Sequence, residues 1–289
     1  MINRLCIIGV GLIGGSLGLA LKEAGKVGEV VGVDQDPDNL EDALRLGLID
    51  RGEMDVVQGV MGADIVVFAA PVGALPFIFK SLQPVWDPEV VYTDTGSTKG
   101  DVIANLVEIF GGVPKNFIPG HPIAGAERSG ARSASGDLFK GRRVILTPLA
   151  TASSKALQTV ENLWHLVGSQ VHEMEPVHHD QVLAATSHLP HVLAFVLTAM
   201  LGRKDEKQDI FQYAAGGFRD FTRIASSDPK MWLDICFANR DEIISLIEAY
   251  RDALGDTADY LKNGDAEPLL KLFQDARAAR QRFIDQVEK

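Results

Sequence analysis

The first half of the chain alternates short apolar runs with longer stretches of helical periodicity. Several runs are continuously apolar, as in residues 65–68, which is typical of parallel strands covered on both faces. Strands are expected at residues 4–10, 29–34, 64–69, 90–93, 117–120 and 143–147, with helices such as 16–24 and 37–46 between them. This alternation predicts an α/β fold with a doubly wound parallel sheet.

After about residue 174 the pattern changes to helical periodicity alone, over residues 177–201, 229–262 and 265–287. The pair Asp228-Pro229 is a good helix start, with Asp as N-cap and Pro at the first helical position. A chain of 289 residues is usually too long for one core. We therefore expect an α/β domain over residues 1–174 and a second, all-helical C-terminal domain over residues 175–289.

Charge and cysteine content exclude several classes of protein. The chain has 39 acidic and 28 basic residues, a net charge of −11, which disfavours binding to nucleic acid. Cys6 and Cys236 lie far apart and form no CxxC pattern, so no disulfide framework is expected. The seven histidines include no HExxH pattern, and we expect no metal site.

Two apolar runs resemble membrane or signal segments only at first sight. Residues 5–21 contain five glycines, which a strand, a turn and a helix explain better than a membrane span. Residues 189–202 contain His191 and are too few to cross a bilayer. We expect a soluble, cytoplasmic protein with no membrane partner.

A glycine pattern follows the first predicted strand. Gly9, Gly11 and Gly14 enclose Val10, Leu12 and Ile13 in a G-x-G-x-x-G sequence that opens a helix. Gly9 would permit the tight turn, Gly11 would let the backbone approach a pyrophosphate, and Gly14 would let helix and strand pack closely. The helix N-terminus would stabilise the phosphate charge. This context predicts a dinucleotide site in a Rossmann-type domain; a glycine-rich turn that binds nothing is the alternative.

The acidic residue that this motif requires lies at Asp34, 20 residues after Gly14 and at the end of the second predicted strand. Its carboxylate would accept hydrogen bonds from the adenosine ribose and repel a 2′-phosphate, and no Lys or Arg follows closely. We therefore expect NAD rather than NADP as cofactor. Pro71, just after the third predicted strand, is assigned to the same cofactor site.

Five further segments follow in a fixed order: DTGSTKG at 94–100, GHPIAGAE at 120–127, SHLPH at 187–191, GFRDFTRIA at 217–225 and DPKMW at 228–232. Over essentially the whole chain, this set resembles the prephenate/arogenate (cyclohexadienyl) dehydrogenase family. The resemblance implies NAD-dependent oxidative decarboxylation of prephenate to 4-hydroxyphenylpyruvate in tyrosine biosynthesis. It also implies a C-terminal dimerisation domain, and therefore a homodimer.

That reaction requires a base for the ring hydroxyl proton, and His121 is the candidate. An imidazole accepts a proton near neutral pH, and His121 lies just past a predicted strand end, where open α/β sheets place their sites. The resemblance makes Ser97 the hydrogen-bonding partner that orients His121 and lines the nicotinamide pocket. From the residues alone, Ser97 serves equally well as the N-cap of the next helix.

The substrate is a dianion, and Arg223 is the expected clamp for its ring carboxylate, because a guanidinium binds a carboxylate through two parallel hydrogen bonds. Ser187 and His191, four residues apart, share a helix face that the resemblance places at the substrate side chain. Trp232 matches a family position near the substrate, although a buried core tryptophan is an equal alternative. Glu127 is expected to gate or tune the site, against a plain surface carboxylate.

Three alternatives stay open. The substrate could be arogenate, alone or with prephenate, because the ring chemistry is identical. A β-hydroxyacid dehydrogenase would have a similar layout, but its catalytic lysine has no match on the helix 177–201. A non-catalytic NAD-binding sensor would need neither His121 nor Arg223.

The first predicted strand starts near residue 4, and the last predicted element is a helix. From these positions we expect neither a chorismate mutase domain nor a regulatory ACT domain. Inhibition by tyrosine would then act at the active site, in competition with the substrate.

Overall fold

The computed structural model describes residues 1–125 and 129–287. By their internal contacts these residues form two compact units, residues 1–242 and residues 243–289. The first unit holds the sheets and most of the helices. The domain boundary expected between residues 174 and 175 stays a prediction.

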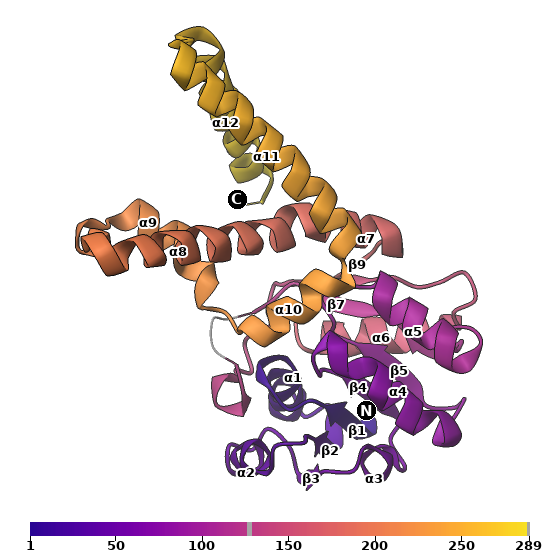
Figure 1. Cartoon of the computed structure of the whole chain (residues 1–289). Helices are drawn as coiled ribbons and strands as arrows, with labels where there is room; N and C mark the ends of the chain where they lie inside the picture. The colour runs from indigo at the N-terminus through magenta and orange to yellow at the C-terminus, as the bar shows by residue number, and fades with distance from the viewer. Residues whose placement is uncertain (126–128, 288–289) are drawn as a thin grey trace. The chain divides into compact units, whose positions relative to one another are not determined.

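A six-stranded parallel sheet organises the first unit, with the strand order β3-β2-β1-β4-β5-β6 (Figure 1). Its strands are β1 (Ile2–Ile8), β2 (Val27–Val33), β3 (Arg51–Glu53), β4 (Ile65–Phe68), β5 (Val91–Asp94) and β6 (Phe117–Ile118). β1 pairs with both β2 and β4, so the strand order reverses beside it. This arrangement confirms the doubly wound, Rossmann-type sheet expected from the sequence.

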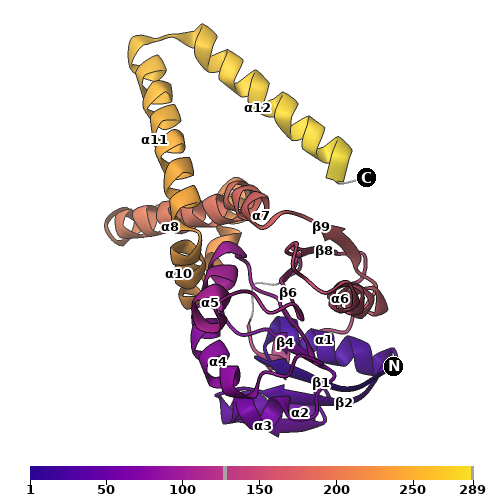
Figure 2. The same cartoon turned by 90° about the vertical axis from the view of Figure 1, so that its right-hand side faces the viewer.

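Alternate residues of each strand supply two separate cores. Leu5 and Ile7 point into one core, and Cys6 and Ile8 point into the other. The first face is covered by α1 (Leu12–Glu23), α2 (Pro37–Arg45) and α6 (Ser154–Leu166); the second by α3 (Val56–Val60), α4 (Leu75–Leu82) and α5 (Gly100–Phe110) (Figure 2). Burial on both faces explains why the strand sequences are continuously apolar.

A second, three-stranded sheet consists of β7 (Gly120–Pro122), β8 (Arg143–Leu146) and β9 (Gln170–Glu173). β7 and β8 are antiparallel, and β8 and β9 are parallel. The single strand expected over 117–120 is therefore divided: β6 ends at Ile118 and β7 begins at Gly120. His121 lies within β7, paired with Ile145, rather than in a loop after a strand.

The helical part of the first unit begins with a long continuous helix. It comprises α7 (Pro176–Leu183), a π-helical turn (Ala184–His188) and α8 (Leu189–Gln208). The π-turn lies directly before Pro190, which lacks a backbone N–H and so disturbs the hydrogen bonding of the preceding turn. The helix continues through the charged residues 203–208, which are mostly exposed on its surface.

This helix, residues 176–208, is long and apolar enough to cross a membrane by length and composition, with a mean hydropathy of 1.5 in its most apolar window. Residues 189–202 were judged too few to cross a bilayer, but the helix that contains them is longer than this segment. The same test is passed by core helices of soluble proteins. Its buried His179, Asp180 and His188 make hydrogen bonds with other elements of the first unit, while only 22% of its most apolar window is buried.

The remaining helices are α9 (Gly216–Thr222), α10 (Pro229–Ala238), α11 (Arg240–Asn263) and α12 (Ala266–Val287). Asp228 caps α10 as expected, accepting a hydrogen bond from Met231 N at 2.8 Å. The helix predicted over 229–262 is interrupted at Asn239, whose side chain is used in buried hydrogen bonds. In the second unit, α11 and α12 expose many large apolar side chains: Ile244, Ile247, Tyr250, Leu254, Leu261, Leu270, Leu272, Phe273 and Phe283.

Candidate active site

The glycine turn between β1 and α1 has the geometry that dinucleotide binding requires. Gly9 has φ +97°, and an added Cβ would lie 2.6 Å from the backbone of Ala69. A Cβ on Gly14 would lie 2.1 Å from the carbonyl oxygen of Gly9. At Gly11 a Cβ would meet no atom within 4 Å, so the turn is open on that side. Gly9 and Gly14 are thus required by the fold, whereas Gly11 leaves space for a ligand.

The N-terminus of α1 faces the same open turn. The helix begins with Leu12 and Ile13, and its N-cap Gly11 provides no side-chain hydrogen bond. The first N–H groups of a helix need acceptors from outside it, and they favour an anion. These residues fit a dinucleotide pyrophosphate.

Asp34 follows β2 and is held beside the turn. Its Oδ2 accepts hydrogen bonds from Val10 N at 3.1 Å and Asn39 Nδ2 at 2.9 Å, and its Oδ1 accepts from Asp36 N at 3.1 Å. Oδ1 therefore keeps capacity for a further donor, such as a ribose hydroxyl. The nearby Arg132 is bound to Asp42, with 2.5 Å between Nε and Oδ2.

Pro71 follows β4 and precedes the short 3₁₀ helix Val72–Ala74. It lies after the carboxyl end of β4, the strand next to β1, because β1 and β4 are parallel neighbours. Open α/β sheets bind ligands at this edge. Its place in the cofactor site stays a prediction.

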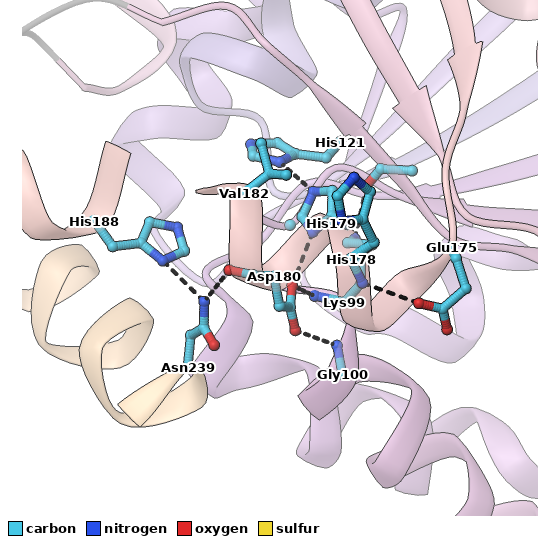
Figure 3. A network of polar contacts seen from close by, with 12 residues as sticks. Lys99, Gly100, His121, Glu175, His178, His179, Asp180, Val182, His188 and Asn239 are labelled. Atoms are coloured by element: carbon cyan, nitrogen blue, oxygen red, sulfur yellow. Dashed lines mark hydrogen bonds and ion pairs between the residues drawn. The ribbon is translucent and has the colours of Figure 1, made fainter. Parts of the chain in front are cut away.

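His121 is buried and hydrogen-bonded through a short chain of side chains (Figure 3). Its Nδ1 lies 2.9 Å from Nε2 of His179, and Nδ1 of His179 lies 2.8 Å from Oδ1 of Asp180. His179 and Asp180 lie on α7, far from β7 in the sequence. They were not predicted as site residues; in the sequence analysis His179 was considered only among the possible metal-binding histidines.

Asp180 also caps α5 from outside that helix. Its two carboxylate oxygens accept hydrogen bonds from Lys99 N at 2.8 Å and Gly100 N at 2.7 Å. Because α5 begins at Gly100 with Lys99 as its N-cap, the alternative that Ser97 caps this helix is wrong.

Ser97 is half-buried in the segment between β5 and α5. Within the described residues no hydrogen bond joins its hydroxyl to His121, whose ring is bound to His179 instead. Orientation of His121 therefore comes from His179 in this structure. A contact of Ser97 with bound cofactor or substrate stays a prediction.

Burial lowers the pKa of His121 well below its ordinary value, and the neighbouring His179, Lys99 and His188 lower it further. The ring is therefore neutral at pH 7. A neutral imidazole whose Nδ1 is engaged has Nε2 as its remaining nitrogen for a ligand. This state suits a proton acceptor.

Lys99 secures the backbone next to His121. Its side chain is fully buried, and Nζ donates to the carbonyl of Gly120 at 2.7 Å and to the carboxylate of Asp94. Asp94 in turn accepts hydrogen bonds from Gly96 N and Gly120 N, at 2.8 and 3.1 Å. This buried ion pair joins the end of β5 to the start of β7.

A second group of residues gathers on the π-turn, α8 and α10. Nδ1 of His191 lies 2.9 Å from the carbonyl oxygen of Ser187, and its ring stacks on that of Trp232 with centroids 3.7 Å apart. Burial lowers the pKa of His191, and the charge of Arg223 adds to this effect. Ser187, His191, Trp232 and Arg223, which were predicted separately, therefore lie in one neighbourhood.

Trp232 has features of both alternatives considered for it. It is buried and packs with Val72 and Ile235 in a small core. The same ring carries His191 on its face. A core position and a place beside the substrate pocket are therefore compatible.

Asn239 connects the two groups. Its Nδ2 donates to the carbonyl of Asp180 at 2.8 Å and lies 3.2 Å from Nδ1 of His188, whose ring is 6.2 Å from that of Trp232 (Figure 3). Burial lowers the pKa of His188 to about 4, so it too is neutral. His188 thereby links the group around Trp232 to the His121 chain.

Glu127 lies outside the described residues. Across residues 1–125 and 129–287, no group of three or more His, Cys, Asp or Glu side chains is arranged to hold a metal ion. Arg219 forms an exposed ion pair with Asp220, with 3.7 Å between Nε and Oδ1.

Comparison with known proteins identifies the family. The model for "Prephenate dehydrogenase, nucleotide-binding domain" matches residues 17–173, and that for "Prephenate dehydrogenase, dimerization domain" matches residues 175–275. The chain belongs to the prephenate dehydrogenase family. The expected family, the NAD-dependent dehydrogenase class and the two-part architecture are thereby confirmed.

Individual relatives agree. Cyclohexadienyl dehydrogenase of Zymomonas mobilis is 34% identical over 281 residues, which cover 96% of this chain and 95% of that protein. Prephenate dehydrogenase of Bacillus subtilis is 34% identical over 286 residues, covering 97% of this chain and 76% of that protein. The crystal structure of prephenate dehydrogenase from A. aeolicus with hydroxyphenyl propionate and NAD⁺ matches with a TM-score of 0.90 and 35% identity, covering 98% of this chain and 99% of that one.

Proposed function

We propose that this chain catalyses the NAD-dependent oxidative decarboxylation of prephenate to 4-hydroxyphenylpyruvate, the precursor of tyrosine. The observation that carries the proposal is the buried, neutral His121, bound through Nδ1 to His179. His121 follows the carboxyl end of β6. The glycine turn after β1 lies at the same edge of the parallel sheet. A pure NAD sensor would have no use for a base at this edge.

Bound NAD⁺ supplies the acceptor for the hydride that leaves the ring carbon bearing the hydroxyl. His121 Nε2 accepts the hydroxyl proton as that carbon becomes a carbonyl. Loss of the ring carboxylate as carbon dioxide then returns an electron pair to the ring, which becomes aromatic, and the phenolic oxygen regains a proton. Prephenate and NAD⁺ thus yield 4-hydroxyphenylpyruvate, carbon dioxide and NADH with no net proton. His121 is required only to hold the proton transiently.

The substrate-side residues fit a dianionic ligand. The Arg223 guanidinium would bind the ring carboxylate through paired hydrogen bonds. Ser187, His191 and the ring of Trp232 would line the space for the substrate side chain. Glu127 would gate or tune the site. The charge that Arg223 exerts on His191 supports their common neighbourhood.

Arogenate, with an amino acid side chain in place of the keto acid, is the second candidate. The family includes a relative described as a cyclohexadienyl dehydrogenase.

The absorbance of NADH at 340 nm, after mixing protein and NAD⁺ with prephenate or with arogenate, tests both candidate substrates. Formation of NADH with prephenate supports the proposal, and the ratio of kcat/KM values names the preferred substrate. No NADH with either substrate, from folded protein that binds NAD⁺, would contradict it.

Replacement of Asp34 by Ser is expected to relax the preference for NAD⁺. The carboxylate, held beside the glycine turn by Val10 N and Asp36 N, would accept ribose hydroxyls and repel a 2′-phosphate. We expect kcat/KM for NAD⁺ to fall roughly tenfold and that for NADP⁺ to rise. Steady-state kinetics with both cofactors measure the change, with Asp38→Ser on α2 as control. A higher kcat/KM of the unaltered protein with NADP⁺ would refute the assignment.

The exposed apolar residues of α11 and α12 support a homodimer, because unpartnered apolar surface of this extent marks a protein interface. We assign residues 175–289 to a substrate-binding and dimerisation domain and place the protein in the cytoplasm. Sedimentation equilibrium at micromolar concentration tests the dimer; a mass of 31 kDa per particle would contradict it.

A further inference from the structure

Asp180, at the end of the hydrogen-bond chain His121–His179–Asp180, determines which nitrogen donates in each bond. Both oxygens of Asp180 accept hydrogen bonds from backbone N–H groups, of Lys99 and of Gly100, while Oδ1 also contacts Nδ1 of His179 at 2.8 Å. An ionised carboxylate can only accept hydrogen bonds. Nδ1 of His179 must therefore carry the hydrogen in this contact.

Neutral histidine has one donor and one acceptor nitrogen, so the direction passes along the chain. With its hydrogen on Nδ1, His179 presents a lone pair at Nε2. That nitrogen lies 2.9 Å from Nδ1 of His121, so His121 donates from Nδ1 and keeps its own lone pair at Nε2. Free histidine in water favours the opposite tautomer, with hydrogen on Nε2, which could not accept a substrate proton there.

We propose that His179 and Asp180 are positioning residues that hold His121 in the Nδ1–H tautomer, so that Nε2 is the proton acceptor of the dehydrogenase reaction. The inference rests on the proposed function of His121 and assigns two residues beyond those predicted from the sequence. Acting through His121, they touch neither substrate nor cofactor. After His121 takes the proton, the Asp180 carboxylate, two hydrogen bonds away, stabilises the positive charge.

The surroundings support an ionised Asp180 and a neutral His121. Burial alone would raise the pKa of Asp180, but hydrogen bonds from His179, Gly100 and Lys99 together bring it below its ordinary value. His179 is fully buried. Its two ring nitrogens form hydrogen bonds with His121 and with Asp180. The charged and titratable groups of other elements that face these residues include the Lys99 ammonium, which is bound to Asp94, and His188. They also include the Asp101 carboxyl of α5, which interacts with Asp180.

Two replacements of His179 separate positioning from simple packing. His179→Leu keeps much of the volume but removes both nitrogens, and we expect kcat to fall about 100-fold or more while KM for substrate and for NAD⁺ changes little. His179→Gln restores an acceptor towards His121 and a donor towards Asp180. Its kcat is expected to be at least tenfold higher than that of His179→Leu. His178→Gln, at the exposed neighbouring position, is the matched control and should behave as the unaltered protein.

The tautomer itself is measured without turnover. In ¹⁵N-labelled protein without ligands at pH 7.5, the His121 ring, identified by its absence in His121→Asn, should show a protonated Nδ1 and an unprotonated Nε2. In His179→Leu the hydrogen should move to Nε2. A protonated Nε2 in the unaltered protein overturns the proposal even if His179→Leu does not fold.

Equal kcat for His179→Leu and the unaltered protein, or equal losses for His179→Leu and His179→Gln with an unchanged tautomer, would also overturn it. If the unaltered protein forms no NADH from prephenate or arogenate, the proposed function fails, and the ¹⁵N spectra alone decide the positioning roles.

Discussion

Replacing His121 by Asn is expected to lower kcat by about 10²- to 10⁴-fold, the usual range for loss of a general base. Asn has no group that accepts and holds the hydroxyl proton. KM for NAD⁺ should stay close to its original value, because the glycine turn and Asp34 follow other strands, β1 and β2. Steady-state kinetics measure both constants, and circular dichroism confirms the fold.

The pH profile gives this prediction a sharper test. His121 must be neutral to accept a proton, so activity falls as pH drops through its pKa. Because burial and neighbouring groups hold that pKa well below 6.5, kcat/KM should be flat from neutral pH to below 6.5 and fall only in more acid solution. In His121→Asn this acid limb should be absent.

His172→Asn is the control for these measurements. His172 pairs with Ile145 from the opposite side to His121 and is exposed. It should leave kcat unchanged. Near-normal turnover in His121→Asn would remove His121 from the mechanism.

The α/β half could be predicted from sequence because its pattern is local. Strands such as β4 are buried on both faces and are therefore continuously apolar, and the glycine turn has close backbone contacts that only glycine allows. The expected strands at 4–10, 29–34, 64–69 and 90–93 all match strands of the parallel sheet. Where burial is slight the pattern fails: β9 is largely exposed, and β3 is only three residues long, so neither was expected.

The candidate site was only partly predictable, because its connections join residues distant in the sequence. His121, Arg223 and His191 stand in recognisable segments. His179 and Asp180 have no such context, and their role depends on α7 packing against β7 and the start of α5. No local pattern shows that a carboxylate will cap a helix 80 residues earlier in the chain. The alternative that Ser97 caps α5 was wrong for the same reason.

Replacing Arg223 by Ala is expected to raise KM for prephenate roughly 100-fold, with a smaller effect on kcat and none on KM for NAD⁺. Two charge-assisted hydrogen bonds to the ring carboxylate together correspond to about this difference in affinity. Arg223→Lys should restore only part of it, because an ammonium cannot form the paired hydrogen bonds of a guanidinium.

Arg219→Ala separates specific binding from the general effect of a lost positive charge. Arg219 is exposed on α9, four residues earlier, and its contact with Asp220 is long at 3.7 Å. On a chain of net charge −11, removing either arginine makes the global field less favourable to a dianion by a similar amount. A large increase in KM for Arg223→Ala alone therefore indicates a direct contact with the carboxylate. Equal, small increases for both variants would show that Arg223 acts only through its charge at a distance, and the clamp would have to be sought elsewhere.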